Sequence, residues 1–190
     1  MKLTTVQEYL ESITDGPISQ PDARTCQATC IAAVMGPDVS IVQVRADLLA
    51  IGEAGNPAVM AQYLTAHFGD RYSLDMTASI DNMRSWIASG EVLITHGWFT
   101  GPGHVICLDG VDKKGFRVMD PWEEFHGFEW LYLADATAFQ GAYSDNLIYA
   151  ACVIGESRSD AHRIYLSSDA IDRSKGGAWV HRIKPGVKSC

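Results

Sequence analysis

The sequence has no long hydrophobic run and no excess of basic residues, and each shortage excludes a class of protein. Its longest apolar runs, such as residues 146–155, are far shorter than the roughly 20 residues that a membrane-spanning helix needs. The formal net charge of −8 leaves it without the basic surface that binding to a phosphate backbone requires. We therefore expect neither a membrane span nor a nucleic-acid partner.

Cysteine is also scarce. The five cysteines (Cys26, Cys30, Cys107, Cys152 and Cys190) leave one unpaired in any arrangement of disulfides, so free thiols are predicted. The first 16 residues contain one lysine and no apolar run, which is not typical of a signal peptide. We expect a soluble protein made in a reducing cytoplasm.

The composition is that of a globular protein. A chain of 190 residues with 47% hydrophobic and 20% charged residues can form one domain with a core of its own. The weakest boundary lies in the polar stretch 155–160. We predict a main domain at 1–155 and, at 156–190, a strand or hairpin extension of the same domain.

Capping signals predict helices in the first half of the chain. Thr4 with Gln7 and Ser40 with Gln43 match capping boxes, which predict helices at about 5–13 and 41–51. Asn56 before a proline predicts a helix that ends near residue 69, and Ser79 begins another that ends near residue 90.

The second half favours strands, because it is rich in β-branched and aromatic residues and is broken by glycine and proline. The predicted strands lie within 91–99, 103–111, 115–122, 146–155, 162–168 and 178–184. Helices first and an antiparallel sheet afterwards indicate an α+β fold.

One cysteine occupies a position that favours reactivity. Residues 26–35 have the pattern of a buried helix, and Cys26 stands at its amino-terminal end. The unpaired amides and the positive end of the helix dipole there stabilise a thiolate, which is the nucleophilic form. Cys30 lies one turn further in and is predicted to be a core residue.

Two further residues fit chemistry at Cys26. His104 follows a flexible GPG segment and begins one strand of a predicted hairpin, whereas Asp120 ends the other strand. Antiparallel pairing brings these ends together, so the carboxylate can orient the imidazole as a base. Gln20, six residues before Cys26, can donate its side-chain amide to an oxyanion.

These segments resemble a known family. The stretch QPDARTC, the helix CQATCIAAVM and the segment GHVICLDGVDKKGFRVMDPW resemble the peptidases related to bacteriocin double-glycine leader peptidases, family thirty-nine of the cysteine peptidases, within the papain-like superfamily. The resemblance covers about residues 20–122. It implies a papain-like fold, with Gln20 as oxyanion donor, Cys26 as nucleophile, His104 as base and Asp120 as its orienting partner.

This chain departs from the family pattern in two respects. Many relatives have glycine after the nucleophile, where this chain has Gln27. The transporter-linked leader peptidases carry membrane segments that this sequence lacks, which argues against leader processing by a transporter.

Other residues near these segments admit two interpretations. Trp98, Phe99 and Trp122 are predicted to line a substrate groove, or else to shield the His104–Asp120 pair from water. His96 is better explained as structural than as part of the site.

Metal binding is the weaker interpretation of the cysteines. A zinc site formed by Cys26, Cys30 and a histidine has little support, because no second cysteine pair is present. Cys107 and Cys152 are predicted to be small buried residues in strands.

The favoured hypothesis is a cysteine-dependent hydrolase that cleaves an amide bond through an acyl-enzyme and needs no cofactor or metal. A peptide, a leader sequence or a peptidoglycan stem peptide would fit as substrate. A virus-encoded lytic or processing enzyme, released or delivered to the cell wall by other machinery, is one setting. The alternatives left open are a transglutaminase-like acyltransferase and an inactive papain-like binding module.

Overall fold

The computed structural model describes residues 19–132, 137–167 and 169–184. Its first half contains α2 (Cys26–Met35), α3 (Ile41–Ile51), α4 (Pro57–Phe68), a 3-10 turn (Gly69–Arg71), β1 (Tyr72–Ala78) and α5 (Ile80–Ala88). Its second half contains β2 (Val92–Gly97), β3 (His104–Val111), β4 (Phe116–Asp120), β5 (Phe125–His126), β6 (Leu131–Tyr132), β7 (Phe139–Tyr143), α6 (Asp145–Ile148), a π-helical segment (Tyr149–Ile154), α7 (Arg158–Tyr165) and β8 (Ala178–Ile183).

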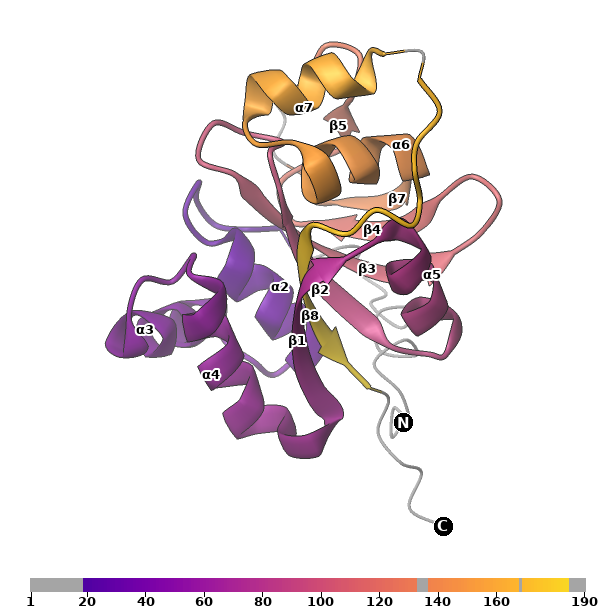
Figure 1. The fold of residues 1–190 in the computed structure, drawn as a ribbon. Coiled ribbons are helices and arrows are strands. Elements are labelled where there is room, and N and C mark those ends of the chain that lie inside the picture. Colours follow the sequence, from indigo (N-terminus) through magenta and orange to yellow (C-terminus); the bar gives the residue numbers. More distant parts are fainter. Residues whose placement is uncertain (1–18, 133–136, 168, 185–190) are drawn as a thin grey trace.

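The architecture is a central antiparallel sheet between two helical layers. The six strands follow the order β1-β8-β2-β3-β4-β7, and β5 and β6 form a separate pair. In Figure 1, α2, α3 and α4 lie on one side of this sheet, whereas α5, α6 and α7 lie on the other. The predicted α+β fold, with a helical N-terminal half packed on an antiparallel sheet, is confirmed.

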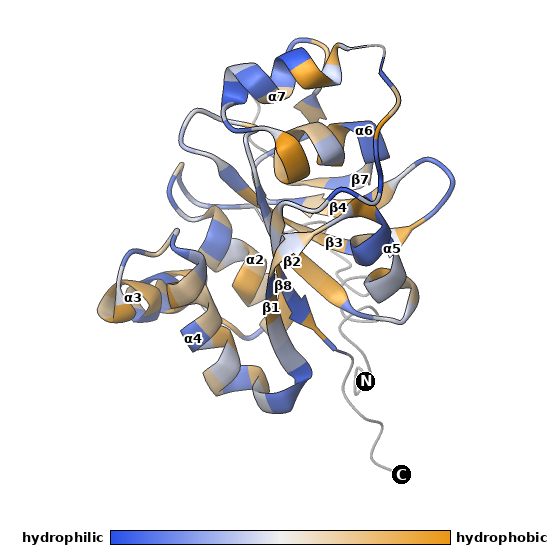
Figure 2. Ribbon diagram, in the orientation of Figure 1, coloured by the Kyte–Doolittle hydropathy of each residue, from blue (hydrophilic) through white to orange (hydrophobic). Residues whose placement is uncertain are grey.

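Both faces of the sheet are buried, so its central strands are hydrophobic along their length. In β3, Val105 and Cys107 pack in the cluster that contains α2, whereas Ile106 and Leu108 pack in the cluster on the other face. Figure 2 shows this hydrophobic character in the middle of the sheet and a mixed pattern along α7. Successive side chains of a strand therefore point to opposite faces of the sheet, and each face packs against its own hydrophobic core.

The capping residues begin helices where the sequence predicts them. The side chain of Ser40 accepts from the Gln43 N–H, that of Asn56 from Ala58, and that of Ser79 from Asn82. The helix predicted at 5–13 lies outside the described residues. Strand β1 is an addition to the prediction: it is only partly buried, and its partner β8 lies about 100 residues away in the sequence.

Two predicted strands are wrong. Residues 146–155 form most of α6 and the π-helical segment, and residues 162–165 form the end of α7. A short apolar run fits a buried helix as well as a strand, and the helix starts are set by Ser144 and Ser157, which accept from Leu147 and Asp160 N–H groups. Cys152 therefore lies in a helical segment and not in a strand.

For the strand or hairpin extension predicted at 156–190, residues 156–167 and 169–184 contain one strand and no hairpin. The predicted second strand is present as β8, but this strand lies between β1 and β2 in the interior of the sheet. The structure therefore joins residues 178–183 to the same sheet that carries β2 and β3.

The β3–β4 hairpin contains an irregularity that positions the candidate site. Cys107 pairs with Met119 and Leu108 with Val118, but Gly110 pairs with Arg117, so Asp109 is the extra residue of a bulge. A register shift of one residue moves a side chain to the opposite face of a sheet. Without the bulge, His104 and Asp120 would point to opposite faces. An ion pair between Asp109 and Arg117 (2.8 Å) bridges the two strands at this point.

Candidate active site

Cys26 is the first residue of α2, and the start of this helix is left open. Thr25 provides no side-chain cap: its hydroxyl oxygen accepts the backbone N–H of Asp22 (3.3 Å), and the hydroxyl donates to the carbonyl oxygen of the same residue (3.0 Å). The first amides of a helix have no partner within the helix and carry the positive end of its dipole. They are therefore available to stabilise a thiolate at Cys26 or a negatively charged oxygen beside it. The Cys26 side chain is 9% exposed.

His104 and Asp120 lie side by side, as the hairpin predicts. The Nε2 atom of His104 donates to Oδ1 of Asp120 at 2.8 Å, and both side chains are buried. Cys26 lies close enough to the imidazole for each side chain to shift the pKa of the other. Because Nε2 is bonded to Asp120, Nδ1 is the nitrogen available to Cys26.

This arrangement shifts the pKa values of both partners toward an ion pair. Burial raises the pKa of the Cys26 thiol, but the hydrogen bond and the positive charge of His104 outweigh burial and bring it below its ordinary value of 9.0. Burial lowers the pKa of His104, but the charge and hydrogen bond of Asp120, assisted by Cys26, raise it to about 10. Both shifts favour the thiolate and the imidazolium over the neutral thiol and imidazole.

Two tyrosines that the sequence analysis missed hold the other oxygen of Asp120. The hydroxyl groups of Tyr132 and Tyr143 each donate to Oδ2 at 2.9 Å. Oδ1 also accepts the backbone N–H of Trp122 at 3.0 Å. No sequence signal links these tyrosines to Asp120, because their proximity depends on β7 pairing with β4 and on the placement of β6.

Gln20 is anchored near the carboxyl end of β4. Its backbone N–H donates to the carbonyl oxygen of Pro121 (2.8 Å), which ties the segment before α2 to the residue after Asp120. Its side-chain Nε2 donates to the carbonyl oxygen of Asp22 (2.6 Å). In this conformation the amide is engaged locally, and it must turn to reach an oxygen beside Cys26.

A cleft of about 660 Å³ opens beside the cysteine. Cys26, Gln27 and His104 line it, together with a loop before α4, the start of α2, part of α3 and the β2–β3 connection. Gln27 is buried, and its Oε1 accepts from the Cys26 thiol at 3.5 Å. Gln27, at which the sequence departs from the pattern that it resembles, therefore contacts the candidate nucleophile.

His96 lies in the same cleft, although the sequence favours a structural role for it. Its ring stacks on Trp179, with centroids 5.3 Å apart. Gly103 packs against its edge so closely that a Cβ atom there would lie 1.8 Å from Nε2 of His96. Burial, together with the positive charge of His104, lowers the pKa of His96 to about 4, so the ring is neutral at neutral pH.

The three aromatic residues predicted to line a groove have different surroundings. Trp98 is partly buried and contacts His96 edge-on, with centroids 5.2 Å apart. Trp122 is partly exposed and lies 6.2 Å from the ring of Tyr132. Phe99 is 1% exposed and packs edge-on to His104 (6.3 Å), which favours the second interpretation, shielding of the imidazole.

The other described cysteines are buried. The thiol of Cys30 donates to the carbonyl oxygen of Val105 (3.4 Å), and burial, with Cys107 nearby, raises its pKa well above the ordinary value. Burial also raises the pKa of Cys152. Across residues 19–132, 137–167 and 169–184, no three His, Cys, Asp or Glu side chains lie together as a metal site would require. Of these thiols, Cys26 is the one with the lowered pKa.

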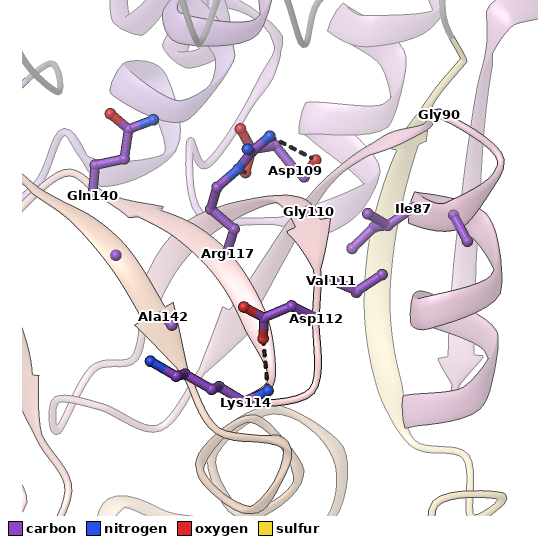
Figure 3. Close-up of a pocket in the computed structure, with 12 residues that line it drawn as sticks. Ile87, Gly90, Asp109, Gly110, Val111, Asp112, Lys114, Arg117, Gln140 and Ala142 are labelled. Atoms are coloured by element: carbon purple, nitrogen blue, oxygen red, sulfur yellow. Dashed lines mark hydrogen bonds and ion pairs between the residues drawn. The ribbon is translucent and has the colours of Figure 1, made fainter.

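A second cavity, of about 620 Å³, lies over β3, β4 and β7 beside α5. Figure 3 shows Asp109 and Arg117 paired at one side of it, with Gln140 nearby and the turn residues Asp112 and Lys114 below. Cys26, His104 and Asp120 are not among its lining residues. Its lining contains no cysteine, serine, threonine or histidine, so the cleft beside Cys26 is the candidate active site.

No family model matches the sequence, and no curated protein matches it either. Among solved structures, the chain is similar to a crystal structure from Bacillus anthracis described as a "putative C39-like peptidase". The match has 14% sequence identity and a TM-score of 0.45, and it covers 90% of this chain and 95% of that chain.

In the part of the chain that the structure describes, the helices are too short or too polar to cross a membrane.

Proposed function

We propose that this protein is a cysteine-dependent hydrolase that cleaves an amide bond through an acyl-enzyme on Cys26. The observation that carries the proposal is the chain of contacts from the Cys26 thiol to the imidazole of His104 and from its Nε2 to buried Asp120 at 2.8 Å. A nucleophile, a base and a group that orients the base are the three parts that such chemistry needs.

The reaction begins with attack of the Cys26 thiolate on the substrate carbonyl carbon. A carbon–sulfur bond forms, and the carbonyl oxygen becomes an oxyanion. The imidazolium of His104 then gives its Nδ1 proton to the amide nitrogen, the carbon–nitrogen bond breaks, and the amine leaves. In the second half, neutral His104 takes a proton from water, whose oxygen attacks the thioester and releases the acid and the Cys26 thiolate.

The developing oxyanion requires hydrogen-bond donors. The uncapped start of α2 supplies the backbone N–H of Cys26, and we assign the second donor to the side chain of Gln20. Gln20 would exchange its bond to the Asp22 carbonyl for one to the oxyanion when substrate binds.

A peptide is the substrate class that fits the cleft best. The cleft runs from Cys26 between the loop before α4 and the β2–β3 connection, and its lining includes Arg24, Arg45 and Glu53. An extended chain with polar or charged side chains suits such a lining, which includes peptidoglycan stem peptides. Trp98 and Trp122 are not among the residues that line this cleft, so the proposal does not depend on them.

The proximity of Cys26 and His104 also argues against the alternative function, an inactive binding module. Such a module would be expected to have a blocked cleft or a separated cysteine and histidine. An accessible cleft and a thiol with a lowered pKa favour catalysis instead. An acyltransferase would use the same groups, and competition between water and an added amine distinguishes it.

The test is alkylation of each cysteine by iodoacetamide across pH, with the sites mapped by mass spectrometry. We expect rapid labelling of Cys26 below neutral pH in the wild type and its loss in His104→Ala, because the imidazolium stabilises the thiolate. Peptides and purified cell walls are then assayed for hydrolysis, with Cys26→Ala as the control. Ordinary thiol behaviour at Cys26, or faster labelling of Cys30, would refute the proposal.

A further inference from the structure

Asp120 is held by more donors than the imidazole alone. Its carboxylate is fully buried and accepts four hydrogen bonds, two at each oxygen. His104 Nε2 and the Trp122 N–H occupy Oδ1, and the two tyrosine hydroxyls occupy Oδ2. A carboxylate has about four lone-pair positions, so each is filled.

The division of donors between the two oxygens fixes the rotation of the carboxylate. If the tyrosine hydroxyls did not hold Oδ2, the group could turn about its terminal bond, and Oδ1 would no longer be fixed opposite Nε2 of His104. A buried charged group is also costly unless it is fully hydrogen-bonded, so Oδ2 needs these donors even though it does not contact the imidazole.

Each tyrosine is itself held in place. The backbone N–H of Phe125 donates to the hydroxyl oxygen of Tyr143 (2.8 Å). Of the two acceptors in reach of the hydroxyl proton, Oδ2 of Asp120 (2.9 Å) is closer than the carbonyl oxygen of Glu123 (3.3 Å). The ring of Tyr143 stacks on Phe139, with centroids 5.6 Å apart. The ring of Tyr132 lies edge-on to the imidazole of His104, with centroids 5.5 Å apart, so it contacts both members of the pair.

We propose that Tyr132 and Tyr143 are positioning residues that hold Asp120 in the orientation that keeps His104 directed at Cys26. This proposal rests on the proposed function of Cys26 and His104. The hydroxyl groups act on the cysteine indirectly, through Asp120 and then through the imidazole. Burial raises the pKa of both tyrosines, and the charge of Asp120 adds to this effect, so both hydroxyls remain protonated donors.

The pH dependence expected from this arrangement involves few groups. Asp120, Cys26 and His96 act on the charge of His104. Tyr132, Tyr143 and Cys30 lie close enough to Asp120 to interact with its charge. The variants below change the hydroxyls of the two tyrosines and leave the other titratable groups in place.

The experiment compares Tyr132→Phe, Tyr143→Phe and the double variant with the wild type. Iodoacetamide labelling of Cys26 at pH 6 should be about tenfold slower in the double variant and less affected in each single variant, as expected when hydrogen bonds to a charged group are lost. The low-field proton resonance of the His104 Nε2–H bonded to Asp120 should weaken or disappear in the double variant.

Tyr72→Phe is the matched control, because the Tyr72 hydroxyl also makes a hydrogen bond, at 2.7 Å to Nδ1 of His181, and does not contact Asp120. It should lose stability without slowing Cys26 labelling. If the double variant does not fold, the two single variants carry the test, because each removes one of the two donors to Oδ2.

The outcomes separate the two proposals. Slow, ordinary labelling of Cys26 in the wild type would refute the proposed function itself. Rapid wild-type labelling that is unchanged or faster in folded tyrosine variants would overturn the positioning role alone. Equal slowing in Tyr72→Phe would mean that the effect is a general consequence of lost stability, which also overturns it.

Discussion

Replacing Asp120 with asparagine tests the electrostatics of the site with little change in shape. The negative charge and hydrogen bond of Asp120 are what raise the pKa of His104 to about 10 against the opposing effect of burial. Without that charge, Cys26 is left to oppose the effect of burial, so the pKa of His104 falls and the imidazolium is less favoured at pH 6 to 7. The Cys26 thiol then loses the positive charge that lowers its pKa.

The magnitude follows from the thiolate fraction. A thiol at its ordinary pKa of 9.0 is about 0.1% thiolate at pH 6. A cysteine whose pKa a neighbouring cation lowers to about 6 is about half thiolate at that pH. The more basic thiolate is intrinsically more nucleophilic, which recovers part of this difference. We therefore expect iodoacetamide labelling of Cys26 at pH 6 to slow by roughly a hundredfold in Asp120→Asn.

The assay is the second-order labelling rate between pH 5 and 9, followed by mass spectrometry of the Cys26 peptide. The difference between variant and wild type should shrink as pH rises toward 9, where an ordinary thiol ionises without help. Asp145→Asn is the control, because Asp145 is a partly buried aspartate whose ion-pair partners are Arg84 and Arg173 and not His104. A wild-type rate at pH 6 in Asp120→Asn would refute the electrostatic reasoning.

Two further predictions concern histidines near the candidate site and in the sheet. Gly103→Ala should lower the free energy of unfolding, measured by urea titration, by about 2 kcal/mol, because residue 103 has a φ of 87° and a Cβ there would collide with His96. The control is Gly101→Ala, whose Cβ meets no neighbouring atom and should change the free energy of unfolding by less than about 0.5 kcal/mol. Equal effects would contradict the close packing of His96. Burial lowers the pKa of His181 to about 3, so the stability it confers is present above its ordinary value of 6.5 and is lost as pH falls toward 3. Between pH 7 and 4 the free energy of unfolding should fall by about 3 kcal/mol through this histidine. The loss should be absent from His181→Leu and retained in Tyr72→Phe, which keeps the titrating ring. Equal dependence of stability on pH in the wild type and His181→Leu would contradict the prediction.

Local signals in the sequence were sufficient where a feature depends on neighbouring residues. The starts of α3, α4 and α5 follow from side chains that cap them within two or three residues. The start of α2 at Cys26 follows from the apolar run that succeeds it. The proximity of His104 and Asp120 follows from a hairpin with a short turn, because such a turn brings the outer ends of its strands together.

Local signals failed where a short apolar segment fits two structures. Residues 146–154 read as a strand by composition, but they are buried on one face of a sheet whose strands are already paired, and they form helix instead. The same holds for residues 162–165, where a charged face and the Ser157 cap favour α7. Propensity over so few residues is weaker than the packing that surrounds them.

The sequence by itself determined the fold class, most of the helices and the residues that form the candidate site. The tertiary structure alone decided which face these residues share. The Asp109 bulge sets the register that places His104 and Asp120 on one face, and the pairing of β7 with β4 and the placement of β6 bring Tyr143 and Tyr132 to the same carboxylate. These contacts join residues from separate strands, and their geometry depends on strand order and register, which no local pattern specifies.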